Sequence, residues 1–162
     1  MRILFVGDIF GKPGREIARK AIPALIEREA LDFVIANVEN SAAGFGVTGD
    51  IADTILSYGV DVMTSGNHIW DKKEVLDYIP RESRLLRPAN FPTGTPGRGS
   101  YLGRTRSGEA IGVINVMGRI FMQPMEDPFA VVLREIDALR PKARVIIVDH
   151  PRRAAIGGVT TD

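Results

Sequence analysis

The sequence predicts a layered α/β fold whose first strands run parallel. Short apolar runs alternate with longer segments in which apolar residues recur at helical spacing, and this alternation is typical of a sheet covered by helices. Connections of helical length between successive strands favour parallel pairing at the start of the chain. The 162 residues suffice for one domain with a sizeable core. No repeat or low-complexity segment interrupts the pattern.

Strands are expected where a short apolar run ends in polar or turn residues. Residues 2–6 end in Gly7-Asp8 and have the composition of a buried strand. A turn at residues 106–109 joins two later runs, and the proline- and glycine-rich residues 91–100 and 121–128 are expected to be loops. The expected strands cover residues 2–6, 33–38, 60–64, 85–91, 101–105, 110–116 and 144–148.

Helices are expected between these runs. Pro13 suits the first turn of the first helix, whereas Pro23 lies inside it and predicts a kink or a later start. Thr48 can cap the second helix and Gly59 can close it. The expected helices cover residues 13–29, 50–58, 72–79 and 129–139.

The composition excludes several classes of protein. Hydrophobic residues make up 44% of the chain and charged residues 25%, as in ordinary soluble domains. A net charge of +1 implies neither a nucleic-acid surface nor a membrane surface. The absence of cysteine excludes disulfides, thiolate nucleophiles and cysteine-based zinc sites. The apolar run at the N-terminus is too short for a signal peptide or a membrane span, so we expect a cytoplasmic protein.

Polar residues follow the predicted strands at one end of the sheet. They are Asp8, Glu39, Asn40, Asn67, His68, Asp149 and His150. Ligands of parallel α/β sheets gather at the carboxyl ends of the strands. Oxygen donors with imidazole suit Mn²⁺, Fe or Mg²⁺, with Zn²⁺ as an alternative. Two cations about 3.5–4 Å apart need a bridging carboxylate, and Glu39 is the candidate.

Each of these residues also has a structural explanation. Asp8 and Asn40 could be turn or cap residues, and His68 could stack on Trp70 or cap the next helix. His150, taken alone, has the features of a surface histidine. Glu39 is harder to explain structurally, because a charged residue that ends an apolar strand is costly to bury unpaired. The chain has only two histidines and both directly follow predicted strands, so the joint pattern favours a site.

The segment GFGVTG at residues 44–49 matches the glycine pattern of dinucleotide-binding folds. In those folds the first glycine follows the strand at once, and an acidic residue ends the next strand roughly 20 residues on. Here residues 39–43 intervene, and Asp61 stands at the start of the next strand. We interpret the segment as a glycine loop beside the site, either one that closes on substrate or a structural turn into the following helix.

Three segments, Gly-Asp-Ile-Phe at 7–10, Asn-Val-Glu-Asn at 37–40 and Ser-Gly-Asn-His at 65–68, resemble calcineurin-like metallophosphoesterases. The sequence is most similar to the bacterial YmdB-like branch, known as cyclic-nucleotide phosphodiesterases. Phe10 stands where most of the superfamily has a metal-binding histidine, and RPANFP at 87–92 and FMQPMEDPF at 121–129 also resemble that branch. The resemblance covers residues 1–150 and implies a layered α/β sandwich.

The resemblance implies a role for each matching residue. Glu39 would bridge two metal ions, and His68 would be the acid that protonates the leaving group or steadies the phosphate. The implied ions are Fe or Mn, with Mg²⁺ or Zn²⁺ as alternatives, and the implied substrate is a small phosphodiester such as a cyclic nucleotide. The implied metal ligands are Asp8, Glu39, Asn40, Asn67 and His150.

The sequence departs from the family after residue 150. The final Gly-x-His-x-His motif is absent, and the tail at residues 151–162 does not resemble the family's continuation. We therefore expect a truncated or frame-shifted chain with an incomplete fold, weakened metal binding, weak or absent turnover, and a sheet edge available for self-association.

Two other functions compete with the phosphodiesterase. The first is an inactive or regulatory family member that binds metal or nucleotide weakly without turnover. The second, a nucleotide-dependent oxidoreductase, depends only on GFGVTG. A serine esterase is disfavoured, because Ile9 occupies the position of the serine.

Overall fold

The computed structural model describes residues 1–119 and 122–150. In chain order the elements are β1 (Ile3–Asp8), α1 (Gly11–Glu29), β2 (Phe33–Asn37), α2 (Gly49–Ser57), β3 (Val62–Thr64), the 3₁₀ helix η1 (Asn67–Trp70), α3 (Val75–Tyr78), β4 (Ser100–Arg104), β5 (Ala110–Asn115), α4 (Pro128–Leu139) and β6 (Val145–Asp149). The predicted tail at residues 151–162 lies outside the described residues.

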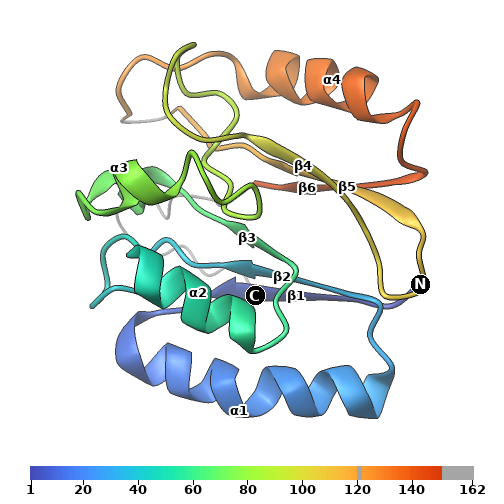
Figure 1. Cartoon of the computed structure of the whole chain (residues 1–162). Coiled ribbons are helices and arrows are strands. Elements are labelled where there is room, and N and C mark those ends of the chain that lie inside the picture. Colours follow the sequence, from blue (N-terminus) through green and yellow to red (C-terminus); the bar gives the residue numbers. More distant parts are fainter. Residues whose placement is uncertain (120–121, 151–162) are drawn as a thin grey trace, which may run out of the picture.

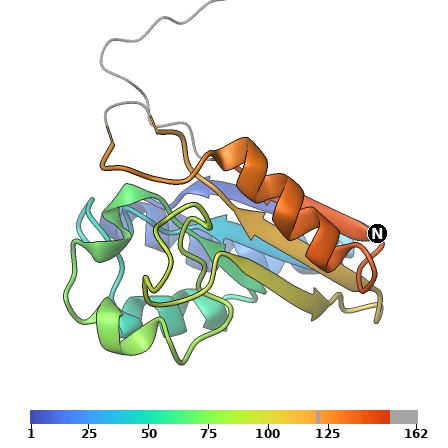
Figure 2. The same cartoon turned by 90° about the horizontal axis from the view of Figure 1, so that it is seen from above.

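Two three-stranded sheets pack face to face between outer layers of helix. The first sheet has the order β1–β2–β3 with parallel strands, and the second has the order β4–β5–β6, with β4 antiparallel and β6 parallel to β5. Helices α1 and α2 cover the outer face of the first sheet, and α4 covers that of the second (Figure 1). The view from above shows α4 running along the strands of the second sheet (Figure 2). The predicted α/β class with parallel strands at the start is confirmed.

The side chains of β2 show how these layers are held together. Phe33 and Ile35 point into the core between the two sheets, whereas Val34 and Ala36 point into the core beneath α1 and α2. All five residues of β2 are buried, because alternate side chains face opposite layers and both layers are covered. A third apolar cluster, which includes Ile114 and Val131, joins the second sheet to α4.

Most predicted helix boundaries match the structure. Thr48 caps α2 by accepting a hydrogen bond from the backbone N–H of Ile51 at 3.4 Å, and Gly59 follows with a φ of +95°. Helix α1 runs unbroken from Gly11 through Pro23, so the later start predicted as one alternative is wrong. No helix in the described part of the chain has the length and apolar character that crossing a membrane requires.

Three predictions at the level of elements need correction. Residues 85–91 form only isolated bridges to Met63 and Arg98, because Pro88 cannot donate to a ladder. The helix predicted over 72–79 is shorter, with α3 limited to Val75–Tyr78. Strand β1 is a sheet edge and not a buried strand, so Phe5 keeps 43% of its surface exposed.

Asn115 ties the two sheets together where β5 ends. Its buried side-chain amide donates to the backbone oxygens of Ser65 at 2.8 Å and Leu86 at 3.2 Å. This contact places the carboxyl ends of strands from both sheets side by side, at the same end of the molecule.

Replacing Asn115 by alanine should destabilise the fold. Ser65 would lose a buried hydrogen-bond donor to its carbonyl, and an unsatisfied buried polar group costs about 1–3 kcal/mol. Thermal unfolding monitored by circular dichroism should show a lower melting temperature than the wild type. Ser57→Ala, which removes an exposed local hydrogen bond on α2, is the control and should change it little. An unchanged melting temperature for Asn115→Ala would show that this link does not support the fold.

Candidate functional site

Asp8 and Asn40 meet at the carboxyl end of the first sheet. The pairing of β1 with β2 shifts register between Val6 and Asp8, and such an irregularity redirects the side chain that follows it. The Asn40 amide nitrogen donates to the Asp8 carboxylate at 2.7 Å. Two residues predicted as metal ligands, which lie far apart in the sequence, are therefore in direct contact.

The Glu39 carboxylate lies inside the same rim and is incompletely satisfied. Its oxygen Oε2 is buried and has no hydrogen-bond partner in the part of the chain that the structure describes. The carboxylate rests against Gly66, where an added Cβ would approach Oε2 to 2.0 Å. The backbone oxygen of Glu39 accepts a hydrogen bond from Gly46 at 2.6 Å, which anchors the glycine loop to this strand end.

Burial and neighbouring charges shift the pKa of Glu39. Burial is the main cause that raises the pKa of its carboxyl above the ordinary value, and the negative charges of Asp8 and Asp149 add to the rise. The charge and backbone N–H of His68 oppose these effects on the pKa. A cation bound here would favour the charged carboxylate, so the arrangement suits a positively charged ligand.

His68 lies on η1, next to Glu39 and under the glycine loop. Its Nδ1 is 2.6 Å from the carboxylate of Asp71, and its ring meets Phe45 edge to face with centroids 5.3 Å apart. Neither partner was predicted, although Asp71 stands three residues after His68, a spacing at which side chains on a short helix meet. The predicted position of the glycine loop beside the site agrees with the contact from Phe45.

Asn67 begins η1 directly after Gly66. Among the described residues its side chain forms no hydrogen bond, so its amide oxygen is available to a ligand.

Asp149 and His150 diverge at the end of β6. Asp149 is buried; burial raises the pKa of its carboxyl, while the polar groups of Thr64 and Asn37 oppose the rise. His150 is exposed and lines an apolar groove beneath α4. Neighbouring residues of an extended chain point to opposite faces, so the burial of Asp149 directs His150 away from Glu39. The structure thus brings Asp149 near the rim and does not bring His150 into contact with the other predicted ligands.

The side chains at the rim are of the type that binds cations, but few of them converge. The buried, unpartnered oxygen of Glu39 and the adjacent carboxylate of Asp8 are hard donors of the type that divalent cations prefer. Among residues 1–119 and 122–150, however, no three acidic or histidine side chains converge closely enough to hold a metal ion. A metal would therefore need the amide oxygens of Asn40 and Asn67, or water, beside the two carboxylates.

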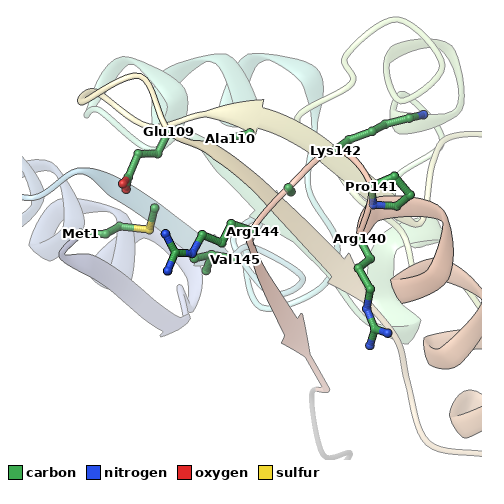
Figure 3. A pocket seen from close by; sticks show the side chains of 9 residues that line it. Met1, Glu109, Ala110, Arg140, Pro141, Lys142, Arg144 and Val145 are labelled. Atoms are coloured by element: carbon green, nitrogen blue, oxygen red, sulfur yellow. The ribbon is translucent and has the colours of Figure 1, made fainter.

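A hollow of about 720 Å³ lies at the opposite end of the second sheet, where β5 and β6 begin. Its cationic side chains, Arg140, Lys142 and Arg144, point apart (Figure 3). They offer no shared site for an anion, so the rim around Glu39 remains the candidate functional site.

Comparisons with known proteins agree with the fold. One curated relative, the 2',3'-cyclic-nucleotide 2'-phosphodiesterase of Bacillus subtilis (strain 168), is 46% identical over 130 residues, which are 80% of this chain and 48% of the relative. The crystal structure of a hypothetical protein from Thermus thermophilus superimposes with a TM-score of 0.85 at 38% identity, covering 95% of this chain and 59% of that one. A structure described as a novel phosphatase from Mycoplasma pneumoniae gives 0.83 at 29% identity, with coverages of 94% and 55%.

The chain spans about half the length of the curated relatives that it matches. The model of the YmdB-like protein family matches residues 4–155, which is nearly the whole of this chain. The match includes every element of both sheets except the first residue of β1. The chain therefore belongs to the YmdB-like protein family.

Proposed function

We propose that this chain is a phosphodiesterase that hydrolyses a cyclic nucleotide with the help of two divalent metal ions. The observation that carries the proposal is the buried, unpartnered carboxylate oxygen of Glu39, which stands beside Asp8 at the rim of a YmdB-like fold. Iron or manganese is the ion that the family resemblance implies, with Mg²⁺ or Zn²⁺ as alternatives. The carboxylate and amide oxygens of the rim suit Mn²⁺ and Mg²⁺.

Asp8, Glu39, Asn40 and Asn67 are the residues that would hold the ions. Bound metal ions supply a water of lowered pKa and neutralise charge on the phosphate. Contacts within the chain fix the positions of these metal-binding side chains. Asn40 donates to Asp8 and so orients its carboxylate, and Gly66 leaves the space that the Glu39 carboxylate needs.

His68 is the proposed acid. The carboxylate of Asp71 accepts a hydrogen bond from Nδ1, which leaves Nε2 as the nitrogen that exchanges a proton. In a phosphodiester hydrolysis Nε2 would donate its proton to the departing ribose oxygen. Phe45 packs against the imidazole and limits its rotation.

The substrate class follows from the similarity and the site together. The Bacillus subtilis relative is named for the 2',3'-cyclic nucleotides on which it acts. We transfer that class to this chain, with a 3',5'-cyclic nucleotide as the alternative. Opening the 2' ester of a 2',3'-cyclic nucleotide leaves the phosphate on the 3' oxygen, so the position of the product phosphate identifies the bond that breaks.

A second function is favoured by two observations. His150 faces away from the rim, and among the described residues no three acidic or histidine side chains converge on a metal. The chain would then be a family member that binds metal or nucleotide weakly and does not turn substrate over.

The deciding experiment measures metal content and hydrolysis on the same preparation. Chain purified without chelators or a metal-binding tag is loaded with Mn²⁺, or with Fe²⁺ under anaerobic conditions, and its metal content is measured by plasma mass spectrometry. Hydrolysis of 2',3'-cyclic AMP and of 3',5'-cyclic AMP is followed by chromatography. Asp8→Ala should lose both metal and activity, whereas Asp77→Ala, an exposed acidic residue on α3, should retain both.

The three outcomes separate the candidate functions. Turnover of roughly 1 per second or more with bound metal, lost in Asp8→Ala, supports the phosphodiesterase. Bound metal or nucleotide without hydrolysis supports the inactive family member. Hydrolysis that survives Asp8→Ala would contradict the assignment of the site.

A further inference from the structure

The ring of Phe45 lies against the proposed acid and is open to solvent. It meets the imidazole of His68 edge to face, with the two ring centroids 5.3 Å apart. In an edge-to-face pair, whichever ring presents its edge, at least one face of the phenyl ring is turned away from the imidazole. The Phe45 side chain is 57% exposed, so a ligand at the rim can reach this ring.

Backbone hydrogen bonds hold Phe45 beside the rim. The residue before it, Gly44, donates to the backbone oxygen of Asn40 at 3.0 Å. The residue after it, Gly46, donates to the backbone oxygen of Glu39 at 2.6 Å. Gly46 has a φ of +75°, and a Cβ there would lie 3.0 Å from a backbone oxygen of η1, so glycine allows the close approach of loop and helix. The loop that carries Phe45 is therefore attached to two of the residues proposed to hold metal ions.

A second exposed phenylalanine borders the same loop. Phe10 is 59% exposed, and a Cβ added to Gly44 would lie 2.9 Å from the tip of its ring. The residue that follows Phe10, Gly11, donates at 2.9 Å to the backbone oxygen of Asn40, which also accepts from Gly44. Single exposed hydrophobic residues are common on protein surfaces, but here two aromatic rings border a polar rim, a combination typical of small-molecule sites.

The chemistry of the proposed substrate brings its base to this part of the rim. In a 2',3'-cyclic nucleotide the base is attached to C1', the carbon next to the one that carries the 2' oxygen. If His68 donates its proton to that oxygen as proposed, the base lies close to the imidazole, and the aromatic ring in contact with the imidazole is that of Phe45. Bases stack readily on aromatic side chains, because every base has a π face.

We propose that Phe45 is the residue on which the base of the nucleotide stacks, in a base subsite that Phe10 also borders. This inference rests on the proposed function and names the part of the substrate that the polar groups of the rim do not recognise. Stacking does not depend on the hydrogen-bonding pattern of a particular base. The subsite should therefore accept every base, and purines should bind more tightly than pyrimidines because they cover more of the ring.

Equilibrium binding tests the subsite apart from catalysis. Isothermal titration calorimetry on the Mn²⁺-loaded chain compares 3'-AMP, which is the expected product, with 3'-CMP and with glycerol 2-phosphate, which has no base. The wild type should bind 3'-AMP most tightly and glycerol 2-phosphate least tightly. Phe45→Leu should weaken the binding of 3'-AMP at least about fivefold, as the loss of a base stack typically does, and leave that of glycerol 2-phosphate unchanged. Phe45→Tyr should bind as the wild type does, because it keeps the ring.

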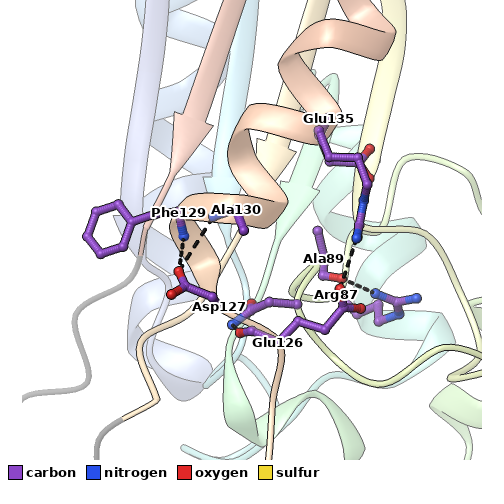
Figure 4. Close-up of polar contacts among 9 residues, drawn as sticks. Arg87, Ala89, Glu126, Asp127, Phe129, Ala130 and Glu135 are labelled. Atoms are coloured by element: carbon purple, nitrogen blue, oxygen red, sulfur yellow. Dashed lines mark hydrogen bonds and ion pairs between the residues drawn. The ribbon is translucent and has the colours of Figure 1, made fainter.

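Kinetics separate a base subsite from a structural role beside His68. Phe45→Leu should raise KM for 2',3'-cyclic AMP and leave kcat close to that of the wild type, because the lost contact is made equally in the ground state and the transition state. It should not change the hydrolysis of glycerol 1,2-cyclic phosphate, which has no base. Phe129→Leu is the matched control, since Phe129 is 80% exposed and its ring extends away from the start of α4 (Figure 4). That variant should change neither binding nor hydrolysis.

Two results would overturn the subsite. A wild type that binds 3'-AMP no more tightly than glycerol 2-phosphate recognises no base. A Phe45→Leu variant that is impaired equally toward 3'-AMP and toward the base-free compounds would show that Phe45 only supports His68. Failure of the proposed hydrolysis has a different signature. A chain that turns over no substrate, but shows a preference for 3'-AMP that Phe45→Leu removes, has the base subsite and binds nucleotide without hydrolysing it.

Discussion

Replacing Glu39 by glutamine should abolish hydrolysis and leave the metal-free chain at least as stable as the wild type. If Glu39 holds metal ions as proposed, its loss should reduce turnover at least roughly 100-fold, as removal of a group that stabilises transition-state charge typically does. The same change removes the negative charge of a buried carboxylate. Its oxygen Oε2 has no hydrogen-bond partner in the described structure. We expect the metal-free variant to gain about 1 kcal/mol, or a melting temperature higher by about 2–4 °C.

The pH dependence of stability gives this prediction a second readout. Burial raises the pKa of Glu39 above its ordinary value of 4.5, so the folded metal-free chain holds this proton more tightly than the unfolded chain does. The resulting stabilisation is fully present below pH 4.5 and is lost as pH rises through the folded pKa. In the Glu39→Gln variant, this decrease in stability with rising pH should be absent.

Scanning fluorimetry with and without Mn²⁺ checks both parts of the prediction. Metal binding stabilises a folded protein to an extent set by ligand concentration and affinity, so the wild-type melting temperature should rise with Mn²⁺ and that of Glu39→Gln should not. Glu29→Gln, an exposed glutamate at the end of α1, is the matched control and should respond as the wild type does. If Glu39→Gln still responds to Mn²⁺ and still hydrolyses substrate, the role assigned to Glu39 is wrong.

Replacing Gly66 by alanine should also abolish hydrolysis, but by displacing the Glu39 carboxylate and not by removing its charge. The new Cβ would lie 2.0 Å from Oε2 of Glu39 and 3.0 Å from Oε1, so the carboxylate would have to move. Forcing an atom into an occupied space typically costs about 1–3 kcal/mol. We expect a lower melting temperature together with the loss of metal-induced stabilisation and of hydrolysis.

Gly7 provides the matched control in the same rim. A Cβ at Gly7 would meet nothing within 4 Å, and its φ does not lie in the left-handed region, so Gly7→Ala should remain close to wild type in both melting temperature and metal response. Equal damage from Gly7→Ala and Gly66→Ala would show that the rim rejects any substitution, and the contact with Glu39 would then explain nothing.

The sequence predicted the fold well because its elements have strong local signals. Strand β2 is a continuous apolar run that is buried on both faces, and α2 has a threonine before it and a glycine after it. The failed strand at residues 85–91 has a suitable composition, but whether it pairs depends on its neighbours and on the position of Pro88. The edge position of β1 is likewise a property of sheet order, which no single segment encodes.

The site could be predicted as a rim but not in its details. Asp8 ends β1, Glu39 and His68 follow β2 and β3, and parallel strands bring such residues together. The sequence could not show which of Asp149 and His150 faces the rim, because that depends on which face of β6 meets the first sheet. The buried Oε2 of Glu39 depends on Gly66, a long-range contact that is visible only after folding.

The rim has a consequence for the order of folding. Asp8, Glu39, Asn40, Asn67 and His68 all belong to the first seventy residues, on β1, β2, β3 and their connections. During synthesis the N-terminal part of a chain leaves the ribosome first and can begin to fold while the rest is being made. Each parallel pairing in this part needs only the helix that precedes the next strand. We therefore expect the chemical groups of the rim to be assembled on the nascent chain, before the second sheet emerges to cover Phe33 and Ile35.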